Sequence, residues 1–395
     1  MTKKYDFDEV IDRKGTDCIK HDLLEPFFGS SDILPVWVAD MDFRVPDFIM
    51  DAIRKRLEHD VLGYTYRSEG FFQSVVDWVK RRHNWTIDRE WITFSPGVVS
   101  AITASVLAHT NPGDKVIVQP PVYFPFFESV RGVKRRLVEN PLKLENGRYY
   151  FDLDDLENKI DNKTRMMLLC SPHNPGGMVW KREELEALAQ ICDRNNILMV
   201  SDEIHADLLF DGQVHTPYAM VSESAAQNSV ICMAPSKTFN VAGLSTSVVI
   251  IPNPEVRKKF DKLMQTLHIN MGNIPGAVAL EAAYIHGDEW LGQMMRYVQD
   301  NYLFLEEYFE KNLPHVRVMR PEATFLVWLD FRAYGMKDKQ LNKFIVEHAK
   351  TGLNNGGRFG TGGDGFMRIN IGCPRSILAE ALDRLREAFS QPGLL

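Results

Sequence analysis

The sequence lacks the features that mark several common classes of protein. Its five cysteines are an odd number and form no CxxC pair, so we expect free, buried thiols in a reducing compartment. No uninterrupted apolar run approaches the roughly 20 residues that cross a membrane. Acidic residues outnumber basic ones and the net charge is −7, which disfavours a nucleic-acid partner. We therefore predict a protein that binds neither nucleic acid nor membrane.

The first residues are charged rather than apolar. The segment MTKKYDFDEVIDRKGTD contains no hydrophobic region of the kind that a secretory signal needs. Together with the unpaired cysteines, this predicts a cytoplasmic location. We find no ligand pattern for a metal ion and predict none.

Short apolar runs alternate with amphipathic stretches from about residue 90 onward. The runs cover residues 115–119, 165–170, 197–200, 229–233 and 247–251. Helical periodicity lies between them, for example over residues 181–195 (KREELEALAQICDRN). β-rich runs separated by helices predict βαβ units and a mostly parallel sheet covered on both faces. The fold class is therefore expected to be α/β.

The pattern of the sequence changes after a long helix that ends near Pro314. Residues 290–312 read as this helix, and strands, a further helix, a glycine-rich turn and a terminal helix follow. A chain of 395 residues is also too long for one small core. We predict a large domain over residues 50–288, and a smaller α+β domain made of residues 1–49 and 289–395.

Three polar residues follow the apolar runs of the predicted sheet. Asn174, Asp202 and Lys237 come just after successive runs, and ligands bind beyond the carboxyl ends of parallel strands. Taken alone, Asp202 could cap a helix or pair with a base, and Lys237 could be a solvated surface charge. Taken together, they supply what a pyridine cofactor needs, an anion for its ring nitrogen and an amine for its aldehyde.

Two further segments could bind the rest of such a cofactor. Ser95-Pro96-Gly97 lies between an apolar run and a helix, where backbone N–H groups could hold a phosphate, although an ordinary strand-to-helix turn would look the same. This turn is neither a GxGxxG fingerprint nor a GxxxxGK[ST] loop. Tyr123 follows the run at residues 115–119, where it could stack on a flat ring or belong to the core.

One arginine stands inside an apolar strand near the end of the chain. Arg368 lies in the segment GFMRIN, and a buried guanidinium is costly unless an anion accompanies it. A substrate carboxylate or a structural ion pair would each meet that need.

The motifs of the chain, taken in order, resemble those of a known family. The chain is similar to fold-type I enzymes that use pyridoxal 5′-phosphate (PLP), of the aspartate aminotransferase superfamily, and in particular to the MalY/PatB-type cystathionine β-lyases, or C–S lyases. The resemblance covers almost the whole chain. The motifs are LPVWVADMDF, GYTY, SPGVVSAI, PPVYFPF, SPHNPGG, SDEIHADL, PSKTFNVAGL, HGDEWL, EATFLVWLDF and GFMRINIGCPR.

The resemblance implies roles around the ring of PLP. Lys237 would hold the cofactor as a Schiff base and then move protons as the catalytic residue. Asp202 would pair with the ring nitrogen, and Asn174 would face the 3′-oxygen of the cofactor. Tyr123 would stack on the ring, and His205 would lie where aminotransferases often carry a tyrosine.

The resemblance also implies roles around the phosphate and the amino-acid substrate. The N–H groups of Val98 and Val99, with Ser236, would bind the phosphate. Tyr64 would reach the phosphate of a second subunit, so the resemblance implies a homodimer with shared active sites. Arg368 would bind the substrate α-carboxylate, helped by Asn174 and by the backbone near Ala39.

Two positions depart from the pattern of many relatives. Ala234 stands three residues before Lys237, where a serine is common, and Ser245 stands eight residues after it, where aminotransferases carry a phosphate-binding arginine. The second departure is itself typical of C–S lyases. The resemblance therefore implies β-elimination from cystathionine or similar S-substituted cysteines, giving a thiol, pyruvate and ammonia. Transfer of the amino group from an L-amino acid to a 2-oxo acid is the alternative, because no single residue decides between the two reactions.

Overall fold

A seven-stranded sheet forms the centre of the computed structural model, which describes residues 3–391. The strand order is β2-β10-β9-β8-β7-β3-β4, and all neighbours are parallel except that β10 is antiparallel to both β2 and β9. The predicted α/β fold with a mostly parallel sheet is confirmed. The strands are β2 (Ile92–Ser95), β3 (Lys115–Val118), β4 (Arg136–Glu139), β7 (Thr164–Cys170), β8 (Leu198–Asp202), β9 (Ser229–Met233) and β10 (Ser247–Ile250).

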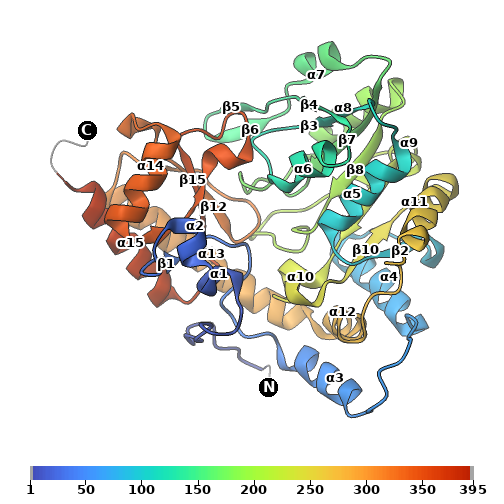
Figure 1. Cartoon of the computed structure of the whole chain (residues 1–395), viewed down its shortest axis with the longest axis horizontal. Helices are drawn as coiled ribbons and strands as arrows, with labels where there is room; N and C mark the ends of the chain where they lie inside the picture. The colour runs from blue at the N-terminus through green and yellow to red at the C-terminus, as the bar shows by residue number, and fades with distance from the viewer. Residues whose placement is uncertain (1–2, 392–395) are drawn as a thin grey trace.

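Helices cover both faces of this sheet (Figure 1). Successive residues of a strand point to opposite faces, so Val116 and Val118 join one buried cluster and Ile117 joins another. Helices α5 (Val98–His109), α6 (Pro125–Arg131) and α11 (Pro254–Thr266) contribute to the first cluster. Helices α4 (Glu69–His83), α8 (Arg182–Arg194) and α12 (Ile274–His286) contribute to the second. Burial on both faces explains why the strands read as continuous apolar runs.

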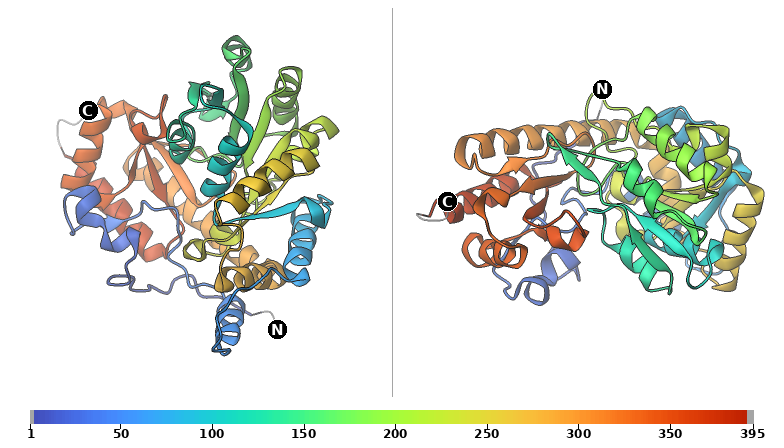
Figure 2. Two further views of the ribbon diagram at one scale, coloured as in Figure 1. Left: turned by 45° about the vertical axis from the view of Figure 1, so that its right-hand side comes forward. Right: turned by 90° about the horizontal axis from the view of Figure 1, so that it is seen from above.

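A second, four-stranded sheet has the order β11-β12-β15-β14, with antiparallel neighbours throughout. Its strands are β11 (Arg317–Val318), β12 (Leu326–Asp330), β14 (Asn354–Asn355) and β15 (Phe366–Asn370). The predicted long helix is α13 (Asp288–Asn312), which Figure 2 shows extending from this sheet toward the rest of the chain. Helices α14 (Asp338–Phe344) and α15 (Arg375–Phe389) belong to the same region.

The N-terminal segment lies beside the second sheet, although the two are far apart in sequence (Figure 1). Strand β1 (Leu34–Pro35) pairs in parallel with β13 (Thr351–Gly352). Residues 36–43 then run toward the main sheet. The remaining elements are α1 (Ile19–Asp22), α2 (Leu24–Phe28), α3 (Asp47–Leu57), α7 (Leu153–Lys159), α9 (Glu223–Gln227), α10 (Pro235–Thr238) and the hairpin of β5 (Lys143–Glu145) and β6 (Arg148–Tyr150).

The cysteines are free thiols, four of them buried and Cys18 partly exposed. Within residues 3–391, no helix combines the length and the apolar character needed to cross a membrane. The same residues contain no group of three or more histidine, cysteine, aspartate or glutamate side chains placed to hold a metal ion.

Candidate active site

The predicted residues at the strand ends meet at one edge of the main sheet. Asp202 ends β8, Lys237 lies in α10 just after β9, Asn174 follows β7, and Tyr123 follows β3. These four strands are parallel neighbours, so their carboxyl ends share an edge. All four side chains line one cavity of about 190 Å³, which we call the cofactor cavity. The predicted convergence is therefore present in the fold.

The amino end of α5 forms another wall of the cofactor cavity. Strand β10 is antiparallel to both β2 and β9, so β2 runs in the same direction as β9. The turn between β2 and α5 therefore lies at the same edge of the sheet. Within the described part of the chain, the N–H groups of Val98, Val99 and Ser100 donate to no protein acceptor. Unpaired N–H groups at a helix start are suited to bind an anion.

Several residues of this wall were not predicted from the sequence. The cavity is also lined by Ser100, Ser245 and Thr246, next to the predicted Ser236. Ser245 has φ of 47° at the end of a short 3-10 turn, which directs the chain back toward the cavity. Ile204 lines the cavity from the turn that follows Asp202, where no strand periodicity indicates the direction of its side chain.

Lys237 is partly buried and its amine contacts the backbone of the VADMDF segment. Its Nζ donates to the carbonyl oxygen of Ala39 at 2.5 Å, and Ala39 also lines the cavity. Burial lowers the pKa of Lys237 to about 8, against the opposing attraction of Asp40. The alternative of a solvated surface charge is therefore wrong. An amine with this pKa is available as a nucleophile and as a base near neutral pH.

Asp202 is a buried carboxyl group that contacts no ion-pair partner among residues 3–391. Burial raises its pKa to about 7, although Lys237 attracts the charged form. Its Oδ1 accepts a hydrogen bond from the backbone N–H of Ile204 at 3.1 Å, so it also stabilises the turn after β8. His205 is buried beside it, and burial lowers the pKa of this imidazole to about 3, so the ring is neutral.

Arg368 is buried next to the cofactor cavity and contacts no carboxylate among the residues that the structure describes. It donates to Oδ1 of Asn174 at 2.9 Å, to Oδ1 of Asn354 at 2.6 Å and to the carbonyl oxygen of Trp37 at 3.1 Å. Its Nε is buried without any partner, and burial lowers the pKa of the guanidinium to about 10. The alternative of a structural ion pair is therefore wrong.

Of the predicted site residues, Arg368 and Tyr64 do not line the cofactor cavity. Arg368 contacts Asn174 of its wall, whereas Tyr64 points into solvent. The side chain of Tyr64 is 98% exposed, in a segment without regular structure between α3 and α4. Val61, Leu62 and Tyr66 in the same segment are also largely exposed. The segment is held against residues 270–271 by Arg67, which donates to the carbonyl oxygens of Asn270 and Met271.

Two buried acids follow Asp202 and have full sets of partners. Asp207 accepts hydrogen bonds from Thr238 Oγ1 at 3.0 Å and from Trp78 Nε1 at 3.2 Å, and lies 3.1 Å from His83 Nε2. Glu203 accepts from Ser201, from the N–H of Tyr218 and from His215. These bonds hold the segment after β8 and the residue that follows Lys237.

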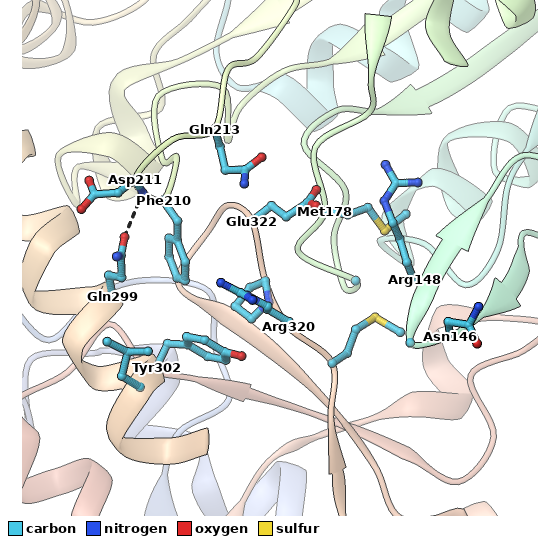
Figure 3. A pocket seen from close by; sticks show the side chains of 15 residues that line it. Asn146, Arg148, Met178, Phe210, Asp211, Gln213, Gln299, Tyr302, Arg320 and Glu322 are labelled. Carbon is cyan, nitrogen blue, oxygen red and sulfur yellow. Dashed lines mark hydrogen bonds between the residues drawn. The ribbon is translucent and has the colours of Figure 1, made fainter. Parts of the chain in front are cut away.

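A further cavity of about 440 Å³ lies apart from these residues (Figure 3). It is lined by the β5–β6 turn, by the loop near Asp211 and by residues of α13 and of segment 319–322. The N–H of Asp211 donates to Gln299 Oε1 at 2.9 Å across one side of it. None of the predicted site residues lines this cavity.

Comparison with known proteins gives relatives over nearly the whole chain. The chain is 43% identical to cystathionine beta-lyase PatB of Bacillus subtilis (strain 168), over 97% of this chain and 100% of that protein. A PLP-bound protein from Clostridium difficile 630, which carries a provisional aminotransferase name, has a TM-score of 0.96 and 42% identity, covering 98% of this chain and 100% of its own. A PLP-bound C–S lyase from Staphylococcus hominis has a TM-score of 0.91 and 33% identity, covering 98% and 99%.

The family assignment follows from these matches. The family model for aminotransferase class I and II matches residues 34–385, which is most of the chain. The resemblance inferred from the motifs is thereby confirmed. This chain belongs to the aminotransferase class I and II family.

Proposed function

We propose that this chain is a PLP-dependent C–S β-lyase that cleaves cystathionine or similar S-substituted cysteines. The observation that carries the proposal is the set of uncompensated buried groups at one edge of the sheet. Within residues 3–391, Arg368 of the neighbouring strand β15 contacts no carboxylate, and Asp202 and Lys237 line one cavity with the free amides of α5. The names of PatB and of the Staphylococcus hominis protein support the lyase reaction.

The residues present fit PLP. The amine of Lys237 can anchor its aldehyde, and the carboxyl group of Asp202 can face its ring nitrogen. Tyr123 and Ile204 provide an aromatic and an aliphatic side chain for the faces of a flat ring. The N–H groups of Val98 and Val99, with hydroxyl groups that include that of Ser236, can hold the phosphate. Asn174 and His205 complete the polar part of the wall.

The chemistry then depends on proton movement by residues of this chain. When bound, PLP withdraws electrons from the substrate Cα and so makes its hydrogen acidic. Lys237, whose pKa burial lowers to about 8, accepts that proton as the catalytic base. Asp202 would share a proton with the ring nitrogen of PLP, since burial raises the pKa of this carboxyl group to about 7 and so disfavours its free anion.

Arg368 orients the substrate. Its guanidinium is suited to bind the α-carboxylate, with Asn174 beside it and the backbone of Ala39 close to the Lys237 amine. Cleavage of the C–S bond leaves the bonding electron pair on sulfur, which departs as a thiol after gaining a proton. One water is consumed overall, and the remaining three carbons leave as pyruvate with ammonia.

We also propose the wider organisation of the protein. A homodimer in which Tyr64 completes the site of a partner is supported by the exposed apolar residues of its segment. The division into domains near residues 50 and 288 is supported by the two separate sheets. Because α3 spans residue 50 and packs on α12, we place the first boundary at the start of α3. A cytoplasmic location is consistent with the free cysteines.

The proposal is tested by incubating the purified PLP-loaded protein with L-cystathionine and no 2-oxo acid. Formation of pyruvate with an equal amount of thiol supports the lyase. If products form only when 2-oxoglutarate or pyruvate is added, the protein is an aminotransferase and the proposed lyase reaction is wrong. A protein that remains colourless after incubation with PLP would contradict both.

A further inference from the structure

A side cavity meets the cofactor cavity at Lys237. It has a volume of about 590 Å³, and Ala39, Lys237 and Ala242 line both spaces. Residues 11–19 and 38–43 supply most of its other walls. An amino acid whose Cα lies beside the Lys237 amine can therefore extend its side chain into this second space.

The side cavity has charged walls of both signs. Arg13 Nη2 donates to Asp40 Oδ2 at 2.7 Å, and its Nη1 donates to Asp42 Oδ1 at 2.6 Å. Lys20 is fully buried behind this wall and donates to Asp42 Oδ2 at 2.5 Å. The two cations and two anions balance, so the wall attracts neither sign of charge as a whole.

Arg13 and Asp40 retain hydrogen-bonding capacity after these contacts. Within residues 3–391, the Nε–H of Arg13 and one hydrogen of its Nη2 donate to no protein group. The side chains of Arg13 and Asp40 remain 22% and 21% exposed, and each carboxylate oxygen can accept more than one bond. A cation and an anion are thus presented side by side in the wall.

The wall that carries Asp40 is rigidly attached. The side-chain amide of Asn240 donates to the carbonyl oxygens of Met41 and Phe43 and accepts from the N–H of Met41. Asn370 donates to the carbonyl oxygens of Val38 and Asp40. Because Asn240 follows Lys237 by three residues, the side cavity keeps a constant position relative to the amine.

We propose that the side cavity receives the leaving group, and that Arg13 and Asp40 select substrates whose distal end carries both a carboxylate and an ammonium group. The distal carboxylate accepts from Arg13 and the distal ammonium donates to Asp40, as charge-assisted hydrogen bonds. An S-alkyl group gains neither contact and desolvates the charged wall. This inference rests on the proposed lyase function and assigns Arg13 and Asp40 as the residues that recognise the distal end of its substrate.

The experiment compares three substrates in two PLP-loaded proteins, the wild type and Arg13→Gln. S-(3-aminopropyl)-L-cysteine lacks only the distal carboxylate of L-cystathionine, and S-(3-carboxypropyl)-L-cysteine lacks only its distal ammonium group. We expect wild-type kcat/KM for L-cystathionine to exceed that for the aminopropyl compound about tenfold to hundredfold. Arg13→Gln should lower kcat/KM by a similar factor for L-cystathionine and for S-(3-carboxypropyl)-L-cysteine, which both carry the distal carboxylate. It should change kcat/KM for S-(3-aminopropyl)-L-cysteine by less than about twofold.

A matched control is Arg44→Gln, which removes an exposed ion pair with Glu9 from the same N-terminal region. It is expected to leave all three values unchanged. An equal loss on all three substrates in Arg13→Gln would overturn the inference, and so would a wild type that cleaves the aminopropyl compound as fast as L-cystathionine. The comparison within the wild type needs no variant to fold. Absence of pyruvate from every substrate would overturn the proposed function and this inference with it.

Discussion

Two groups of buried ionisable side chains, one along the segment after β8 and one at the cofactor cavity, differ in whether their charges are compensated. Asp207 and Glu203 each lie against a histidine and accept further hydrogen bonds. Within residues 3–391, Asp202 accepts from one backbone N–H, and the hydrogen bonds of Arg368 go to neutral oxygen atoms. Unpaired buried charge is costly, whereas paired acids support a fold. Asp207 and Glu203 therefore stabilise the fold, whereas Asp202 and Arg368 are available to bind a ligand.

The largest effect is expected at Lys237. Lys237→Ala removes both the anchor for PLP and the base that accepts the Cα proton, so turnover should fall by at least about a thousandfold. The measurement is pyruvate release together with the visible absorbance of the PLP-loaded protein. Lys262→Ala, which changes an exposed lysine on α11, should alter neither. An equal loss of pyruvate release and of visible absorbance in Lys237→Ala and Lys262→Ala would contradict the role of Lys237.

The next effect is a loss of stability at Asp207. Asp207→Ala leaves Thr238 Oγ1, Trp78 Nε1 and His83 without their shared acceptor. The free energy of unfolding in urea should fall by about 3–5 kcal/mol. Asp202→Asn, measured in the same way without PLP, should cause no such loss. If the two variants were equally destabilised, the distinction between paired and unpaired acids would be wrong.

A smaller effect is expected on substrate binding at Arg368. Arg368→Lys keeps the charge but loses the planar two-donor geometry, so kcat/KM for L-cystathionine should fall about 30-fold to 100-fold. The stability of the PLP-free protein should not decrease, because no carboxylate partner is lost. Steady-state kinetics and urea unfolding of the same preparations give both values. A marked loss of stability with unchanged kinetics would assign Arg368 a structural role.

The pH dependence of stability should have opposite signs at the two acids. The pKa of Asp202 is raised to about 7 in the fold, so between about pH 4 and pH 7 the folded state retains a proton that the unfolded state has released. Its contribution to stability therefore falls as pH rises. In the absence of PLP, the free energy of unfolding of Asp202→Asn minus that of the wild type should increase by on the order of 2 kcal/mol between pH 4 and pH 7. A constant difference across this range would contradict the raised pKa.

Asp207 provides the opposite case. Its hydrogen bonds and the nearby positive charge lower its pKa in spite of burial, so its stabilisation is present above its ordinary pKa and is lost as pH falls through that range. The stability difference between the wild type and Asp207→Ala should therefore shrink in acid. Urea unfolding at several pH values measures both trends in one series.

The smallest effect is expected at Ser245. Ser245 lines the cofactor cavity next to Thr246 and Ser236. Ser245→Ala removes at most one hydrogen bond to the phosphate, so PLP should bind about twofold to tenfold more weakly. Fluorescence titration of the PLP-free protein measures this change. A loss of a hundredfold or more would mean that Ser245 is a principal phosphate ligand.

The sequence predicted those parts of the site that depend on local patterns. The strand ends at Asn174, Asp202 and Lys237 could be located because buried parallel strands read as apolar runs and share one ligand-binding edge. The contact of Arg368 with the carbonyl oxygen of Trp37 could not, because it depends on the packing of segments more than 300 positions apart.

The charged wall of the side cavity was missed for a related reason. Arg13 and Asp40 lie on irregular backbone, where no periodicity indicates which side chains meet. The full burial of Lys20 also contradicts the usual expectation for a lysine. The acid–histidine contacts of Asp207 and Glu203 connect residues more than ten positions apart, so no local motif reports them.

The most direct test is chemical identification of the residue that carries the cofactor. The PLP-loaded protein is reduced with borohydride, digested and analysed by mass spectrometry. We predict a pyridoxyl phosphate group on the peptide that contains Lys237 and on no other lysine, with loss of pyruvate release after reduction. A label on another lysine, or full activity in the reduced protein, would contradict the account.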